Sequence, residues 1–194
     1  PDGDAVGSVL GFYHLLKSFD KHPVIISHSP VPSYLQFADP ERKIQKYIPA
    51  EHNSIIAGAD VIVCLDFNTI KRVNSMESAV RSSAATKICV DHHQNPEKVF
   101  HWIYSDILAS STCEMVYRMI KKINPAAFVP ESILALYLGI VTDTGSFRFD
   151  RTTPEVHKIT ADLIARGADI MLVTRNIYES SSMGRVKAVG EMIN

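Results

Sequence analysis

Apolar residues recur along the chain in two patterns, one typical of amphipathic helices and one typical of buried strands. Residues 6–18 carry them at helical spacing, which predicts a helix. Continuous β-branched runs at 61–65 and 88–90 predict buried strands, and residues 24–26 and 100–104 are further strand candidates.

Helical spacing dominates the second half of the chain, while Pro30, Pro32 and Pro40 predict irregular structure in the first half. Strands that alternate with helices predict βαβ units, so we expect an α/β fold with a mostly parallel sheet and helices on both faces. The further helices are expected at 112–123, 131–142, 154–166 and 168–179, and another begins within 183–194.

Size and charge restrict the class of protein. A chain of 194 residues with 46% hydrophobic residues suffices for one well-buried domain. Its 20 basic and 21 acidic residues nearly cancel, which disfavours a protein that grips long duplex nucleic acid but suits a short phosphorylated substrate. Three cysteines without a C-x-x-C pair and no apolar stretch of about 20 residues predict a cytoplasmic protein that does not enter the membrane.

Carboxylates follow several of the apolar segments. Asp2 and Asp4 precede the first predicted helix, Asp66 and residues 91–93 (Asp-His-His) follow predicted strands, and Asp143 ends a predicted helix. Open α/β sheets gather their ligands at the carboxyl ends of strands, so these groups are expected to share one crevice. Crowded aspartates repel one another, and divalent metal ions are the expected counter-charge.

Each of these residues also has a structural interpretation. Asp2 and Asp4 flank a glycine in what could be an ordinary turn, and Asp66 could cap a turn with the polar residues that follow it. Asp143 could accept a loop hydrogen bond. Arg148 could contact a phosphate or form an exposed salt bridge.

Taken in order, these elements resemble the DHH phosphoesterase family, which is named for the Asp-His-His that stands here at 91–93. Its four motifs correspond to residues 1–5, 63–66, 90–93 and 139–148. Residues 109–114 and 153–157 also resemble family sequence, so the likeness covers nearly the whole chain.

The resemblance implies a site for two divalent metal ions, usually Mn²⁺, with Mg²⁺ or Co²⁺ as alternatives. Asp66 would bridge both ions and take part directly in catalysis. Asp2 would bind the first ion, and the second would be held by Asp4, His92 and Asp143.

The resemblance also implies roles for neighbouring groups. His93 would be catalytic, facing the substrate phosphate or assisting proton transfer, while Asp91 would orient a neighbouring imidazole from outside the coordination sphere. The family usually has a histidine four positions before Asp2, a position that this sequence does not contain. The first metal site is therefore expected to be incomplete.

The likeness is strongest to the branch of nano-RNA phosphodiesterases that also act on 3′-phosphoadenosine 5′-phosphate. It implies hydrolysis of short oligoribonucleotides or of this small nucleotide by a hydroxide that two metal ions activate. We expect residues 1–180 to form a DHH catalytic domain lacking its extreme N-terminus. Residues 181–194 would begin a linker helix towards a carboxyl-terminal substrate-binding lobe that is missing here.

Other functions remain open at this point. A cyclic-dinucleotide phosphodiesterase, an inorganic pyrophosphatase or a single-strand exonuclease would use the same metal centre. A non-catalytic alternative is a regulatory domain that binds nucleotide without turnover. A homodimer is compatible with each of these functions.

Overall fold

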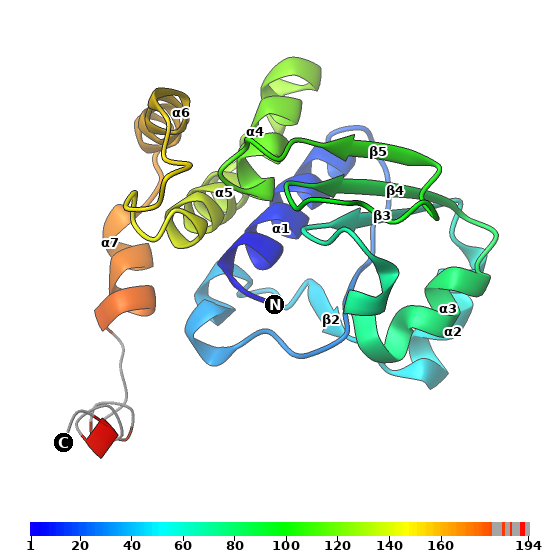
Figure 1. Ribbon diagram of the computed structural model, residues 1–194. Coiled ribbons are helices and arrows are strands. Elements are labelled where there is room, and N and C mark those ends of the chain that lie inside the picture. Colours follow the sequence, from blue (N-terminus) through cyan, green and yellow to red (C-terminus); the bar gives the residue numbers. More distant parts are fainter. Residues whose placement is uncertain (180–183, 185–186, 188–190, 193–194) are drawn as a thin grey trace.

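All the strands in the computed structural model are parallel and short (Figure 1). The model describes residues 1–179, 184, 187, 191 and 192. One sheet pairs β1 (Ile25–Ser27) with β2 (Ile44–Lys46), and the other has the order β3 (Val61–Leu65), β4 (Thr86–Asp91), β5 (Trp102–Ser105). The predicted parallel arrangement is confirmed, although it is divided between two sheets.

Helices make up most of the remaining structure. None of those within the described residues is both long and apolar enough to span a membrane. The α-helices are α1 (Gly3–Lys17), α2 (Pro49–Gly58), α3 (Glu77–Ser82), α4 (Thr112–Ile123), α5 (Pro130–Asp143), α6 (Pro154–Ala165) and α7 (Ile170–Thr174). Shorter turns are the 3₁₀ segments η1 (Ser33–Ala38), η2 (Ile70–Met76) and η3 (Pro125–Ala127) and the π-helical η4 (Arg175–Glu179).

Two hydrophobic cores lie on opposite faces of the three-stranded sheet. Val63 and Leu65 of β3 join the larger core, which contains α1, α4 and α5. Ile62 and Cys64 point the other way, into a smaller core with α2, η2 and α3. Because successive side chains of a strand point to opposite faces, both faces are buried by helices, as predicted (Figure 1).

The sequence-based boundaries need three corrections. The first helix begins at Gly3 rather than at residue 6, because Asp2 caps it. The region expected to be irregular contains η1 and β2, and α2 follows it unpredicted, with a proline in its first turn where proline is tolerated. The predicted helix 168–179 is divided into α7 and η4, and most of the predicted 183–194 helix lies outside the described residues.

Candidate metal centre

Four of the predicted site residues, Asp4, Asp66, His92 and Asp143, form one cluster of side chains. The first turn of α4 fixes Asp4 in this cluster. Its side chain is buried, and its two carboxylate oxygens accept hydrogen bonds from the backbone N–H groups of Thr112 (2.7 Å) and Cys113 (2.8 Å). Helix α4 begins there because the Ser111 hydroxyl accepts a hydrogen bond from the Glu114 amide. The positive end of the α4 dipole thus holds a carboxylate that is distant in sequence.

Glycines let α1, α4 and α5 approach closely around Asp4. A Cβ atom on Gly7 would overlap the backbone of Ala135, and one on Gly139 would overlap the Cys113 sulfur and touch Asp4. This contact brings the carboxyl end of α5, where Asp143 is the last residue, to the amino end of α1.

Asp66 enters the same cluster from the end of β3. Its backbone is left-handed, with φ of 65°, a conformation that Asp tolerates better than most residues and that often occurs at functional sites. Its Oδ1 accepts a hydrogen bond from the Thr112 hydroxyl (3.2 Å). The first residue of α4 therefore contacts Asp4 through its amide and Asp66 through its side chain.

His92 lies at the centre of the cluster, just beyond β4. Its Nε2 atom is 3.4 Å from Asp143 Oδ2, 3.7 Å from Asp66 Oδ1 and 3.9 Å from Asp4 Oδ2. Its Nδ1 atom is 3.3 Å from the carbonyl oxygen of Ala109. With Nδ1 as the donor, Nε2 directs a lone pair towards three carboxylates, an arrangement typical of metal-binding histidines.

Asp91 holds the second imidazole. It is buried, its Oδ1 lies 2.7 Å from His93 Nδ1, and its Oδ2 accepts a hydrogen bond from the His93 backbone N–H (3.1 Å). The His93 side chain remains 39% exposed. The Asp91 carboxylate thereby orients the His93 ring, and the rest of that ring stays accessible at the rim of the cluster.

The electrostatics of the cluster call for a cation. Burial and the nearby carboxylates, Asp4 first, raise the pKa of Asp66 to about 10. Burial and then Asp2 raise the pKa of Asp143 to about 6, and burial with Asp143 raises that of Asp4. Ionising all these carboxyls together is unfavourable without positive charge between them.

Two overlapping groups of side chains could each hold an ion. Within each group the potential ligand atoms all lie within 4.8 Å of one another. Oxygen and imidazole donors of this kind suit a divalent ion such as Mn²⁺ or Mg²⁺. The groups are Asp4, His92 and Asp143, and Asp66, His92 and His93.

Asp2 and Arg148 lie apart from these groups. The exposed Asp2 caps α1 by accepting the Ala5 amide (3.0 Å), although it lines a cavity of about 160 Å³ together with Asp66. Arg148 is exposed and its Nε donates to the Gly145 carbonyl (2.6 Å), so it braces its own loop.

Two other arginines are connected with the cluster or with the cavity beside it. Arg72 lines the cavity beside Asp2 and Asp66. The charge of Arg151 acts on Asp143 and opposes the rise in the pKa of that carboxyl. The sequence does not single out Arg72, because an arginine several residues beyond a strand is usually a solvated surface charge. Arg151 follows the fourth motif closely, as Arg148 does, so its sequence position allows either a phosphate contact or an exposed salt bridge.

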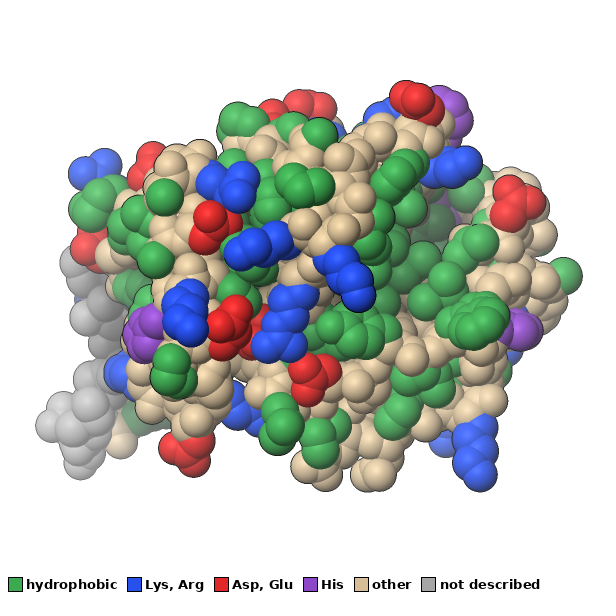
Figure 2. All heavy atoms as spheres, turned by 90° about the horizontal axis from the view of Figure 1, so that it is seen from above, with side chains coloured by type: hydrophobic (Ala, Val, Ile, Leu, Met, Phe, Trp, Pro, Cys, Tyr) green, Lys and Arg blue, Asp and Glu red, His purple; other side chains and the backbone are tan. Residues whose placement is uncertain are grey.

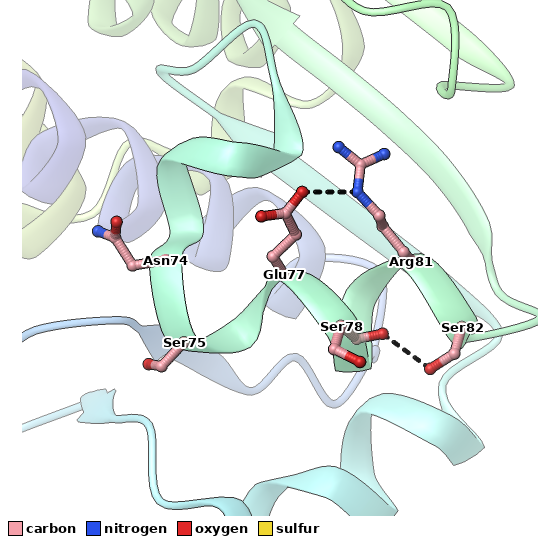
Figure 3. A pocket seen from close by; sticks show the side chains of 6 residues that line it. All are labelled: Asn74, Ser75, Glu77, Ser78, Arg81 and Ser82. Atoms are coloured by element: carbon pink, nitrogen blue, oxygen red, sulfur yellow. Dashed lines mark hydrogen bonds and ion pairs between the residues drawn. The ribbon is translucent and has the colours of Figure 1, made fainter.

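A larger but shallower depression, about 680 Å³, lies on η2 and α3 (Figure 3). Its arginine, Arg81, is already paired with Glu77 (2.8 Å) and Glu97 (2.7 Å), and the rest of its lining is neutral and polar. It lacks the unpaired carboxylates and imidazoles of the cluster, so we place the chemistry at the cluster.

The family model described as the N-terminal domain of the DHH family matches residues 1–140 of this sequence. The chain belongs to the DHH family. Among its relatives, the bifunctional oligoribonuclease and PAP phosphatase NrnA of Thermus thermophilus is 31% identical over 90% of this chain and 50% of its own length. The protein of the same name from Bacillus subtilis is 28% identical over 93% of this chain and 55% of its own.

Solved structures include a close match to this DHH domain. The exopolyphosphatase-related protein of Bacteroides fragilis superposes with a TM-score of 0.94 and 35% identity, covering 100% of this chain and 58% of its own. The chain spans about half the length of the curated relatives it matches.

Proposed function

We propose that this DHH domain is the catalytic part of a hydrolase that cleaves phosphate esters with two divalent metal ions. The observation that carries the proposal is the position of His92 Nε2, within 3.9 Å of three buried or half-buried carboxyl groups whose joint ionisation requires positive charge between them. Such ions, when bound, lower the pKa of water and neutralise phosphoryl oxygens.

The side chains divide into ligands and orienting groups. Asp66 lies near the carboxyl groups of Asp4 and Asp143 and is suited to contact both ions. Asp2 lines the cavity beside Asp66 and is suited to contact the ion on that side. The second ion would be held by Asp4, His92 and Asp143. Oxygen-rich sites of this kind favour Mn²⁺, with Mg²⁺ and Co²⁺ as alternatives.

His93 is the residue best placed to handle substrate. Its Nδ1 is engaged by Asp91, which leaves Nε2 to meet a phosphate oxygen or to transfer a proton. Asp91 acts through His93, by fixing the tautomer and orientation of that ring. His93 and Asp66 are thus the proposed catalytic residues, and Asp91 positions one of them.

The proposed substrates are short oligoribonucleotides and 3′-phosphoadenosine 5′-phosphate. Two relatives with 31% and 28% identity carry both activities in their names, and the net charge of −1 argues against tight binding of long duplexes. We assign residues 1–180 to the catalytic domain and 181–194 to the start of a linker towards a substrate-binding lobe.

A turnover assay tests the proposal. The purified full-length protein should hydrolyse both substrates with Mn²⁺ and stop on chelation, and Asp66→Ala should reduce turnover by about a thousandfold or more, because it removes the shared ligand. Asp60→Asn, at an exposed acid outside the cluster, is the matched control and should retain activity. Equal residual hydrolysis by Asp66→Ala would contradict the assignment, and tight nucleotide binding without product would favour a regulatory domain.

A further inference from the structure

Glu114 is a buried acid near the metal cluster that the proposed function does not use. It lies in the first turn of α4, within the segment 109–114, and is only 1% exposed. On the face of the molecule shown in Figure 2, acidic and basic side chains are interspersed near the centre, and exposed ion pairs of that kind contribute little. A carboxylate as buried as Glu114 is costly unless its oxygens have partners, so those partners indicate what it holds.

Both oxygens of Glu114 have partners in the connection between β5 and α4. Its Oε2 accepts hydrogen bonds from the Ser110 backbone N–H (2.7 Å) and from the Ser110 hydroxyl (2.7 Å). Its Oε1 accepts a hydrogen bond from the Arg118 guanidinium, which also donates to Asp106 Oδ2 (2.9 Å). Asp106 is the first residue after β5, and Ser110 is close to the start of α4. The carboxylate and its arginine therefore hold the connection near both of its ends.

The N–H group that Glu114 binds belongs to the same peptide group as the carbonyl that His92 contacts. This group joins Ala109 to Ser110, and it is trans and planar, so its N–H and C=O point in opposite directions. The N–H donates to Glu114, and the carbonyl oxygen lies 3.3 Å from His92 Nδ1. Hydrogen bonds in series polarise one another, so the charged acceptor at one end makes the carbonyl a better acceptor at the other.

We propose that Glu114 is a positioning residue for His92 and acts through the peptide group between Ala109 and Ser110. It keeps the carbonyl turned towards the imidazole, so that the proton stays on Nδ1 and the Nε2 lone pair faces the carboxyl groups of the cluster. Without the carboxylate the peptide group can rotate and present its N–H to the ring. That contact favours a proton on Nε2, which then cannot bind a metal ion. The inference rests on the proposed function and adds a residue outside the coordination sphere.

A simpler interpretation is that Glu114 only caps α4. An acid at the third position of a helix is common, and in a capping box it binds the backbone N–H of the N-cap residue. The N-cap residue here is Ser111, whereas Glu114 binds the N–H of Ser110, one position earlier. Its bonds therefore hold the peptide group that faces His92, in addition to any effect on the helix.

Glu114→Gln in the full-length protein tests the inference, because it keeps the shape of the side chain and removes its charge. The affinity for Mn²⁺, measured by calorimetry, should fall about 10- to 100-fold. Asp162→Asn is the matched control and should keep the wild-type affinity. Asp162 also accepts hydrogen bonds from a hydroxyl group, that of Tyr117 in α4 (2.6 Å), and from an arginine, Arg166 (2.7 Å).

The state of the His92 ring separates positioning from general stabilisation of α4. In protein with isotope-labelled histidine and saturating Mg²⁺, the Nδ1 proton of His92 should give a magnetic resonance signal, assigned by its loss in His92→Gln. In Glu114→Gln the signal should move upfield and exchange faster with water, and in Asp162→Asn it should not change. Ser110→Ala is a milder variant that removes only the hydroxyl bond, and it should shift the signal upfield by a smaller amount.

An unchanged signal in Glu114→Gln would overturn the inference even if the affinity fell, because the residue would then only stabilise the helix. If Glu114→Gln does not fold, an unchanged signal in Ser110→Ala would overturn it as well. Neither measurement requires turnover. A wild-type protein that binds Mn²⁺ without hydrolysing substrate would therefore contradict the proposed function and leave this inference in place.

Discussion

At the residue scale, Asp91 and His93 lie two positions apart and have different roles, one orienting and the other accessible to substrate. Asp91 ends β4 with its side chain buried, so its carboxylate can meet only groups inside the crevice. Its bonds to the His93 ring and amide fix the direction in which that ring points. The exposed part of the ring is then available for substrate, which makes the pair sensitive to a change in either member.

Replacement of Asp91 by Asn should lower turnover about 10- to 100-fold, the usual effect of removing an orienting partner. The asparagine amide can donate to Nδ1 and so favour the wrong tautomer of His93. The pH–rate profile should change shape while Mn²⁺ affinity, measured by calorimetry, changes little. A large loss of affinity with an unchanged profile would show that Asp91 serves the metal instead.

The sequence locates candidate side chains better than it places them. It marks Asp4, Asp66, His92 and Asp143 because each follows or precedes an apolar segment, and the structure brings all four together. The exposure of Asp2 and the local bond of Arg148 depend on caps and loop turns that have no periodic signal. The same limitation hides Arg72, whose position depends on how η2 folds back towards α1.

At the scale of elements, the site depends on how tightly three helices meet. Helix α4 was predicted at 112–123 with correct bounds, because its apolar and charged positions are strongly segregated and Ser111 provides a cap. Helices α2 and α3 were not predicted, since their apolar residues show weak periodicity and prolines or serines flank them. The close approach of α1 and α5 could not be predicted from the sequence either, because only the structure shows which glycines lie between the helices.

Substitution of Gly139 by Ala tests this approach. The added methyl would overlap the Cys113 sulfur and press on Asp4, so we expect a loss of about 1–3 kcal/mol in the free energy of unfolding and weaker metal binding. Gly58→Ala is the control, since no atom lies within 4 Å of the added Cβ, and it should be neutral or slightly stabilising. Chemical denaturation with and without Mn²⁺ measures both effects. Equal stabilities of the two variants would show that the helices can separate without cost.

At the scale of the whole molecule, the acids that form the site oppose folding when no cation is present. In the unfolded chain an aspartate has a pKa near 4, whereas Asp143 has a pKa of about 6 and Asp66 of about 10 in the fold. Protonated carboxyls therefore contribute stability below about pH 4, and that contribution is lost as the pH rises through the folded values. Bound metal ions reverse this pH dependence of stability, because they bind only the ionised carboxylates.

The melting temperature should therefore respond to Mn²⁺ more strongly at pH 8 than at pH 5. A ligand at a hundred times its dissociation constant adds about 2.7 kcal/mol. For a chain of this size that corresponds to a shift of roughly 5–11 °C. Thermal scans with Mn²⁺ or with a chelator measure the difference, and Asp66→Asn should show almost none. A larger shift at pH 5 would mean that the carboxyls are not the groups that respond.

The bonds that hold Asp4 come from the main chain of α4, and this has a consequence for evolution. No replacement of a side chain at position 112 or 113, proline apart, deletes an amide, so the two bonds to Asp4 do not themselves depend on which residues stand there. The identity of these residues is constrained instead by the packing of the Cys113 sulfur and by the bond of the Thr112 hydroxyl to Asp66. What selection must preserve is the point at which the helix starts. An insertion or deletion just before α4 would therefore displace this anchor even if every side chain of the cluster were kept.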